Sequence, residues 1–184
     1  MANITFNISL FIYLFAALGY SLYLVYRRPL VKSLSFFSLG VGLLFHTVNI
    51  SLRSMETGHG PYTTGFEITS FLAWAIVVIF FITEWKYKIQ DLGAFIIPVV
   101  FLIFLYSAFQ SREYSLINES ATMFWLTMHR TLSIIGYAAF AIGFGVAVMY
   151  LIQENQVKRK KLGVMYFRMP SLEVLDNLNH KAIA

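Results

Sequence analysis

Cysteine is absent from the 184-residue sequence, and charged residues are scarce. Without cysteine the chain has no disulfide, no zinc–thiolate site, no cysteine nucleophile and no point for thioether attachment of a prosthetic group. Asp, Glu, Lys and Arg make up only 12% of the residues, against about 25% in a typical soluble protein. Hydrophobic residues make up 58% and the mean hydropathy is +0.68, so the chain is an integral membrane protein.

The formal net charge of +5 does not indicate a nucleic-acid partner. The basic residues stand in short clusters between apolar runs, which is the pattern of loops that meet the cytoplasmic leaflet of a membrane. We therefore expect the lipid bilayer as a partner and no nucleic acid.

Five apolar runs are long enough to cross the roughly 30 Å hydrocarbon core as helices. They lie near residues 6–26, 34–52, 66–82, 92–109 and 124–152. The sequence predicts an all-α fold, with one polytopic membrane domain over residues 1–184. The N-terminal segment has no basic region before its apolar run, which favours an uncleaved anchor.

The turns alternate in charge along the chain. Basic residues concentrate at the turns after the first, third and fifth runs, namely Arg27, Arg28, Lys32, Lys86, Lys88 and Lys158 to Lys161. The positive-inside rule therefore places these turns in the cytoplasm and the N-terminus outside. Residues 84–88 are predicted as a cytoplasmic turn, and residues 110–122 as an external loop.

A further segment, residues 158–184, follows the fifth run. We expect a cytoplasmic connector and then a helix that opens at Pro170-Ser171. Leu172, Leu175 and Leu178 recur on one face, which is typical of an amphipathic interfacial helix. The apolar ending after Lys181 favours the alternative, the truncated start of a sixth span.

Two histidines lie inside predicted spans, where polar groups are costly and each is a functional hypothesis. His46 shares one helix face with Asn49 and Arg53, because the three are spaced i, i+3, i+7. His129 lies roughly 9 Å inside the outer end of the fifth span. The two imidazoles would face each other if their helices were neighbours, and neutral imidazole is the commonest haem-iron ligand. On the residues alone, hydrogen bonding within the bundle is favoured for both.

Four other side chains near the outer boundary are candidates for binding. Arg130 suits a carboxylate or a haem propionate, although an arginine at this depth more often snorkels to the interface. Glu67 is expected to form an ion pair with Arg130 or Arg53. Trp74 and Trp125 either stack on a porphyrin or fill the outer interface, and the second is the commoner role.

Three stretches together resemble a known family. They are R-S-M-E-T-G-H-G-P-Y-T-T-G-F-E-I-T-S-F-L-A-W at residues 53–74, F-W-L-T-M-H-R-T-L-S-I-I-G-Y-A-A-F at 124–140 and M-P-S-L-E-V-L-D-N-L-N-H-K-A-I-A at 169–184. In this order they resemble the haem-handling cytochrome c assembly family, the CcsA, CcmC and HemX group. Thr64 stands where that family usually has asparagine.

The resemblance implies a role for His129. This residue matches the first of two external histidines that flank the family's tryptophan-rich segment, which implies an axial ligand to haem b. His46 is a second, weaker candidate ligand, and with Glu67 and Trp74 it would frame the outer half of the bundle. The tryptophan-rich segment and the second histidine would follow residue 184, so we expect either a longer protein or a second polypeptide to supply them.

The resemblance also implies a function in a bacterial inner (cytoplasmic) membrane. The chain is expected to be a CcsA-like subunit that binds or delivers haem for attachment to apocytochrome c. It would act with a CcsB/ResB-type partner, within a cytochrome c synthase complex. One alternative is a b-type electron-transfer anchor with haem between His46 and His129. Another is a HemX-like regulatory or structural subunit without haem.

Overall fold

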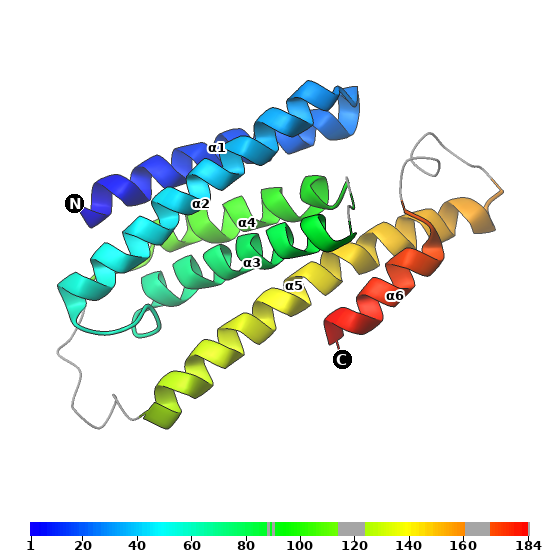
Figure 1. Cartoon of the computed structure of the whole chain (residues 1–184). Coiled ribbons are helices and arrows are strands. Elements are labelled where there is room, and N and C mark those ends of the chain that lie inside the picture. The colour runs from blue at the N-terminus through cyan, green and yellow to red at the C-terminus, as the bar shows by residue number, and fades with distance from the viewer. Residues whose placement is uncertain (88, 90, 114–123, 161–169, 184) are drawn as a thin grey trace.

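A computed structural model describes residues 1–87, 89, 91–113, 124–160 and 170–183, and this part of the chain is helical without strands. Its helices are α1 (Ala2–Tyr26), α2 (Pro29–Thr57), α3 (Gly65–Tyr87), α4 (Leu92–Ala108), α5 (Phe124–Lys158) and α6 (Leu172–Ile183) (Figure 1). The predicted all-α membrane bundle is confirmed. The connector over residues 162–169 and most of the loop over 110–122 lie outside the described residues.

Helices α1 to α5 run alternately in opposite directions (Figure 1). The ends of α1 and α3 therefore lie with the starts of α2 and α4, where Arg27, Lys32 and Lys86 are found, and α5 runs on in the same direction to Lys158. We name this the basic end of the bundle. The opposite end, which the positive-inside rule places outside, is named the outer end.

Four of the five predicted spans are helices long and apolar enough to cross a membrane, namely α1, α2, α3 and α5. Helix α4 has 17 residues, or about 25 Å, which is at the short limit for a span. The helices extend past the predicted spans: α2 reaches Thr57 rather than residue 52, and α5 reaches Lys158 rather than 152. Hydropathy marks only the part in hydrocarbon, whereas the helical hydrogen bonds continue into the polar interface.

The predicted turn at residues 84–88 is wrong in its position. Glu84 to Tyr87 form the last turn of α3, and the connection to α4 is correspondingly shorter. A cross-helix ion pair holds this turn, because Lys32 Nζ of α2 lies 2.9 Å from Glu84 Oε1.

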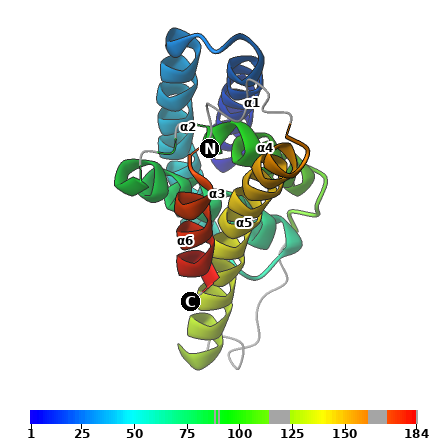
Figure 2. The same ribbon diagram turned by 90° about the vertical axis from the view of Figure 1, so that its right-hand side faces the viewer.

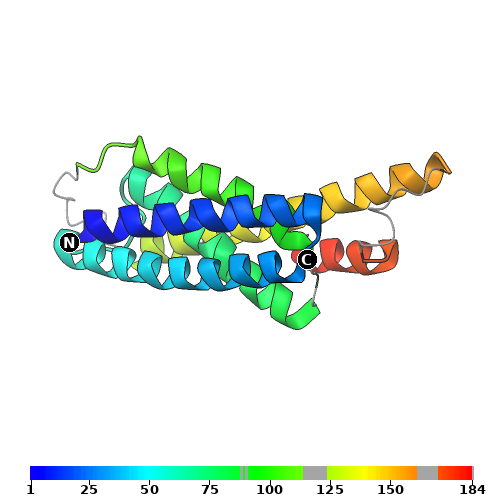
Figure 3. The same ribbon diagram turned by 90° about the horizontal axis from the view of Figure 1, so that it is seen from above.

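The packing order of the helices decides which side chains can meet. Helix α1 packs along α2 and α4, and α3 packs along α4 and α5. Figures 2 and 3 show α5 on the far side of the bundle from α1 and α2. Within the described part of the chain α5 makes no packing contact with α1 or α2. Helix α4 is enclosed between α1 and α3, and Ile97, Val100 and Phe104 are fully buried.

Helix α6 turns back along the basic-end half of α5 (Figure 2). Its start just after Pro170-Ser171 confirms the predicted helix. Leu175 is buried, whereas Glu173, Asp176 and His180 are exposed, so the amphipathic pattern is confirmed. Helix α5 itself continues beyond the other spans at the basic end (Figure 3).

Candidate functional site

A groove at the outer end contains two of the predicted site residues. It has a volume of about 320 Å³ and lies between α5 and the segment that leads into α3. Helix α5 contributes residues spaced three to four apart, which places them on one face. The lining residues are Tyr62, Thr63, Ile68, His129, Arg130, Ser133, Ile134 and Tyr137.

His129 is exposed in this groove. Among the described residues it makes no hydrogen bond and no ion pair. Its ring nitrogens are therefore accessible to a ligand. Arg130 is half-buried beside it, and Tyr137, two turns further along α5, is 64% exposed. The groove volume is at the lower end of the range for small-molecule and cofactor pockets.

One wall of the groove is fixed by two hydrogen bonds. The hydroxyl of Tyr62 lies 3.1 Å from Thr127 Oγ1, which ties the segment before α3 to the first turn of α5. The backbone N–H of Thr63 donates to Glu67 Oε2 at 3.2 Å. Tyr62 and Thr127 were not predicted as site residues, because only the packing of α3 on α5 brings them together.

Glu67 is the centre of a buried polar cluster behind this wall. It is 2% exposed and accepts hydrogen bonds from Arg53 Nε at 3.1 Å and from the backbone N–H of Thr64 at 3.3 Å. Thr64 Oγ1 in turn accepts from the Glu67 N–H at 3.2 Å, which completes a capping box at the start of α3. The predicted ion pair is confirmed with Arg53.

Arg112 covers this cluster from the segment after α4. Its guanidinium lies over the rings of Phe6 and Phe66, at 4.7 and 5.0 Å from their centroids. Its carbonyl oxygen accepts from Arg53 Nη2 at 2.6 Å. Burial and the charge of Arg53 lower the pKa of Arg112 from its ordinary value. The sequence predicted only a polar loop residue here.

His46 lies in a different environment from His129. Its ring is fully buried and stacks on Phe104 at 4.1 Å between centroids. Nε2 lies 2.9 Å from Ser70 Oγ, and Nδ1 lies 3.3 Å from the Tyr13 hydroxyl. Both nitrogens are thus engaged within the bundle. Since α2 and α5 do not pack together in the described chain, the structure does not bring His46 to His129.

The structure also places Asn49, on the polar face of α2, and the two candidate tryptophans. Asn49 is buried and donates to the carbonyl oxygen of Ala2 at 2.6 Å, so the predicted inward face of α2 is confirmed. Trp74 Nε1 donates to Thr47 Oγ1 at 2.9 Å, in the seam between α2 and α3. Trp125 is 80% exposed at the start of α5 and does not line the groove. Of the six predicted site residues, only His129 and Arg130 share the groove.

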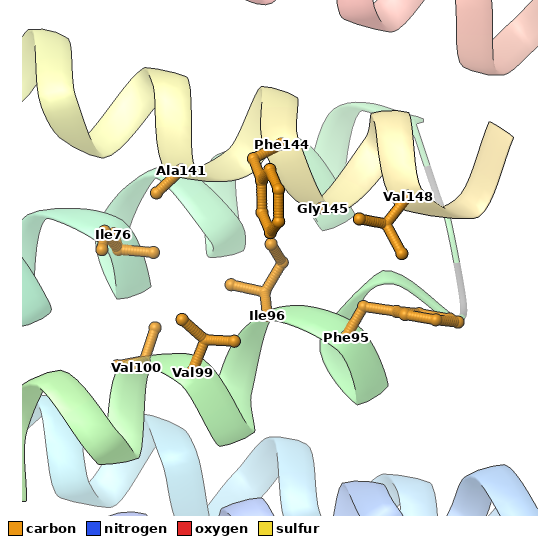
Figure 4. A pocket seen from close by; sticks show the side chains of 9 residues that line it. All are labelled: Ile76, Phe95, Ile96, Val99, Val100, Ala141, Phe144, Gly145 and Val148. Carbon is orange, nitrogen blue, oxygen red and sulfur yellow. The ribbon is translucent and has the colours of Figure 1, made fainter. Parts of the chain in front are cut away.

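A second pocket, of about 390 Å³, lies between α3, α4 and α5 (Figure 4). Phe144 of α5 and Ile96 of α4 point toward each other across it. Its side chains are all apolar, so it offers no ligand to a metal ion. The lining residues are Ile76, Phe95, Ile96, Val99, Val100, Ala141, Phe144, Gly145 and Val148.

Comparison with known proteins places the chain in a family. A family model described as "Cytochrome C assembly protein" matches residues 62–184, which begin at the Tyr62 wall and include all of α5. The chain is 23% identical to the cytochrome c biogenesis protein CcsA of Guillardia theta over 203 residues, covering 98% of the chain and 67% of that protein. No solved structure matches it significantly.

Two further relatives extend the comparison. The chain is 24% identical to protein HemX of Bacillus subtilis (strain 168) over 167 residues, covering 90% of the chain and 60% of HemX. It is 23% identical to the CcsA protein of Synechocystis sp. over 181 residues, covering 94% of the chain and 54% of that protein. The chain thus spans about half to two thirds of the length of these relatives.

Proposed function

The chain belongs to the cytochrome c assembly protein family, and we propose on this premise that it takes part in cytochrome c maturation by holding haem b at the outer end of the bundle. His129 is the proposed axial ligand. The observation that carries this proposal is the exposed imidazole of His129 in a groove that also contains Arg130.

The groove residues fit such a group in three respects. A neutral imidazole supplies the lone pair that haem iron takes most often. The planar guanidinium of Arg130 can donate two parallel hydrogen bonds to a propionate carboxylate. Ile68 and Ile134 add apolar surface for a porphyrin edge. The histidine, the arginine and the apolar residues would together form one wall of the proposed haem site.

The amino-acid composition indicates which part of the maturation reaction this chain performs. Bound haem would supply the vinyl groups that react with cysteine thiols of an apocytochrome c. This chain has no cysteine. Its own part is therefore to ligate the haem iron, to orient the haem and to shield it. A CcsB/ResB-type membrane partner is proposed to complete the system in a bacterial inner membrane, and the second axial ligand is proposed to come from outside residues 1–184.

The two alternatives differ from this proposal in what they require. A b-type electron-transfer anchor would need His46 and His129 on one haem, whereas His46 is enclosed and hydrogen-bonded on a helix that does not touch α5. A HemX-like subunit without haem is supported only by the similarity to proteins named HemX.

Haem content of the purified protein tests the proposal. We expect His129→Ala to lower haem occupancy at least about tenfold, because even outer-shell partners of metal ligands cost 10–100-fold in affinity when mutated. His180→Ala, at an exposed histidine of α6, is the matched control and should leave occupancy unchanged.

Three outcomes would reject the proposal. Wild-type occupancy in His129→Ala would show that His129 is not a ligand. Equal loss in His46→Ala and His129→Ala, with the helical circular dichroism intact, would favour the b-type anchor. A wild-type protein that binds no haem would favour the HemX-like subunit.

A further inference from the structure

A second groove, with mixed polar and aromatic lining, lies at the basic end. It has a volume of about 550 Å³ and is formed where α1, α2 and α3 come together. Its principal lining residues are Tyr23, Lys32, Ser33, Phe36, Glu84 and Trp85. We name it the interfacial groove. It is remote from His129, which lies at the outer end of α5.

The depth of this groove corresponds to the membrane interface. Tyr23 lies in the last turn of α1, Lys32 in the first turn of α2 and Glu84 in the last turn of α3. Trp85 is 83% exposed next to Glu84, and exposed tryptophans are enriched at the headgroup level. The groove therefore faces phospholipid headgroups rather than the hydrocarbon core.

The groove contains one positive and one negative side chain, and the negative one is incompletely satisfied. Lys32 Nζ lies 2.9 Å from Glu84 Oε1, and both side chains are largely buried. The other carboxylate oxygen, Glu84 Oε2, is buried without a hydrogen-bond partner among the described residues. The hydroxyl of Tyr20, one turn deeper on α1, is also without a partner there. Buried polar atoms of this kind are rare and require an explanation.

The neighbouring cation Arg27 is already engaged. Arg27 pairs with Asp91, and its guanidinium lies 5.3 Å from the centroid of the Tyr23 ring. Lys32 and Glu84 are the charged residues that line the groove, where they pair with each other. Because the pair is electrically neutral, it complements a zwitterion better than an ion of one sign.

We propose that the interfacial groove binds the headgroup of phosphatidylethanolamine. The phosphate takes Lys32 Nζ and the exposed Ser33 hydroxyl as donors, and the ammonium group donates to the Glu84 carboxylate beside the exposed ring of Trp85. A phosphatidylcholine headgroup has no N–H to donate to Glu84. A phosphatidylglycerol headgroup adds a negative charge without an ammonium to balance it. This inference does not depend on the proposed function.

Lipid retention after reconstitution tests this proposal. The whole chain is placed in nanodiscs with equal amounts of phosphatidylethanolamine, phosphatidylcholine and phosphatidylglycerol, and retained lipids are identified by native mass spectrometry. We expect the wild type to retain phosphatidylethanolamine about tenfold more than phosphatidylcholine, the effect of one charge-assisted hydrogen bond. Equal retention of the two lipids by the wild type would overturn the proposal.

Two single variants separate the two halves of the headgroup. Glu84→Gln should abolish the preference for phosphatidylethanolamine and shift retention toward phosphatidylglycerol, because Lys32 then remains as an uncompensated cation. Lys32→Gln should lower retention of all three lipids. Glu154→Gln is the matched control, since Glu154 also pairs with a lysine, Lys158, at 2.9 Å near the basic end. It should behave as the wild type.

Misfolding is separated from loss of binding by the charge-reversed double variant. Lys32→Glu combined with Glu84→Lys keeps an ion pair between α2 and α3 but exchanges the positions of the charges. We expect native helical circular dichroism with at least fivefold weaker lipid selectivity. Wild-type selectivity in this variant or in Glu84→Gln would contradict the assigned roles.

Discussion

Replacement of Glu67 by alanine is expected to be among the most destabilising single changes in the bundle. The side chain is 2% exposed and accepts from Arg53 Nε and from the N–H groups of Thr63 and Thr64. Its removal deletes the carboxylate that pairs with Arg53 and leaves two backbone donors at the start of α3 without their acceptor. Breaking a buried ion pair by removing one partner costs about 3–5 kcal/mol.

The cost of about 3–5 kcal/mol already includes the loss of the capping box. The two losses are not additive, because one carboxylate accepts from all three donors. Glu67→Gln keeps the shape and one oxygen acceptor, so it should cost about 1–3 kcal/mol. Reversible unfolding in detergent, followed by circular dichroism, measures both values. Glu56→Ala is the control, since Glu56 is exposed near the same end of α2. It should change stability by less than about 0.5 kcal/mol. A cost below about 1 kcal/mol for Glu67→Ala would refute the reasoning, since surface changes alone reach about half that value.

Two other substitutions test the packing inside the bundle. Gly145→Leu should cost about 1 kcal/mol, the low end for overpacking, because a Cβ on Gly145 would lie 2.1 Å from Ile96 Cδ1 and the Ile96 side chain must turn into the adjacent pocket. Gly136→Leu on the same helix should be nearly neutral in the same unfolding assay, since a Cβ there meets nothing within 4 Å, and equal costs would contradict the assigned contact. His46→Ala should destabilise the bundle by about 2–4 kcal/mol through a lost hydrogen bond and a cavity. Its haem content, measured by absorbance per protein, should stay at the wild-type level, and a loss there would reassign His46 as a ligand.

The spans could be predicted from sequence because hydropathy reports burial in lipid directly. Each of the five apolar runs coincides with a helix. Four of these helices extend beyond their runs, and α4 matches its run to within one residue. The extensions were missed for a physical reason. Glu84 and Lys86 are too polar to count as membrane-embedded, yet the pairing of Glu84 with Lys32 keeps the last turn of α3 helical.

The polar cluster at the outer end was predictable only in part. The spacing of His46, Asn49 and Arg53 indicated an inward face, and Glu67 was expected to pair with Arg130 or Arg53, of which the structure shows Arg53. The T-x-x-E pattern at Thr64 is a capping-box signal that was available in the sequence. The position of Arg112 over Phe6 depends on how α1 and α4 pack, which no local pattern contains.

The candidate site itself depended on a helix-packing question that the sequence leaves open. The sequence indicates similar depths for His46 and His129, so depth alone would allow them to share a ligand. The order of packing separates them, because α3 and α4 lie between α5 and the pair of α1 and α2 (Figure 1). His129 keeps its proposed role through its exposure in the groove, and its ligation of haem stays a prediction.

Imidazole rescue of the haem spectrum tests this ligation most directly. The His129→Gly variant is loaded with haem and titrated with imidazole while its absorption spectrum is recorded. If His129 is the axial ligand, imidazole should restore the wild-type spectrum in the variant and leave that of the wild type unchanged. A wild-type spectrum in His129→Gly before any imidazole is added would contradict the account.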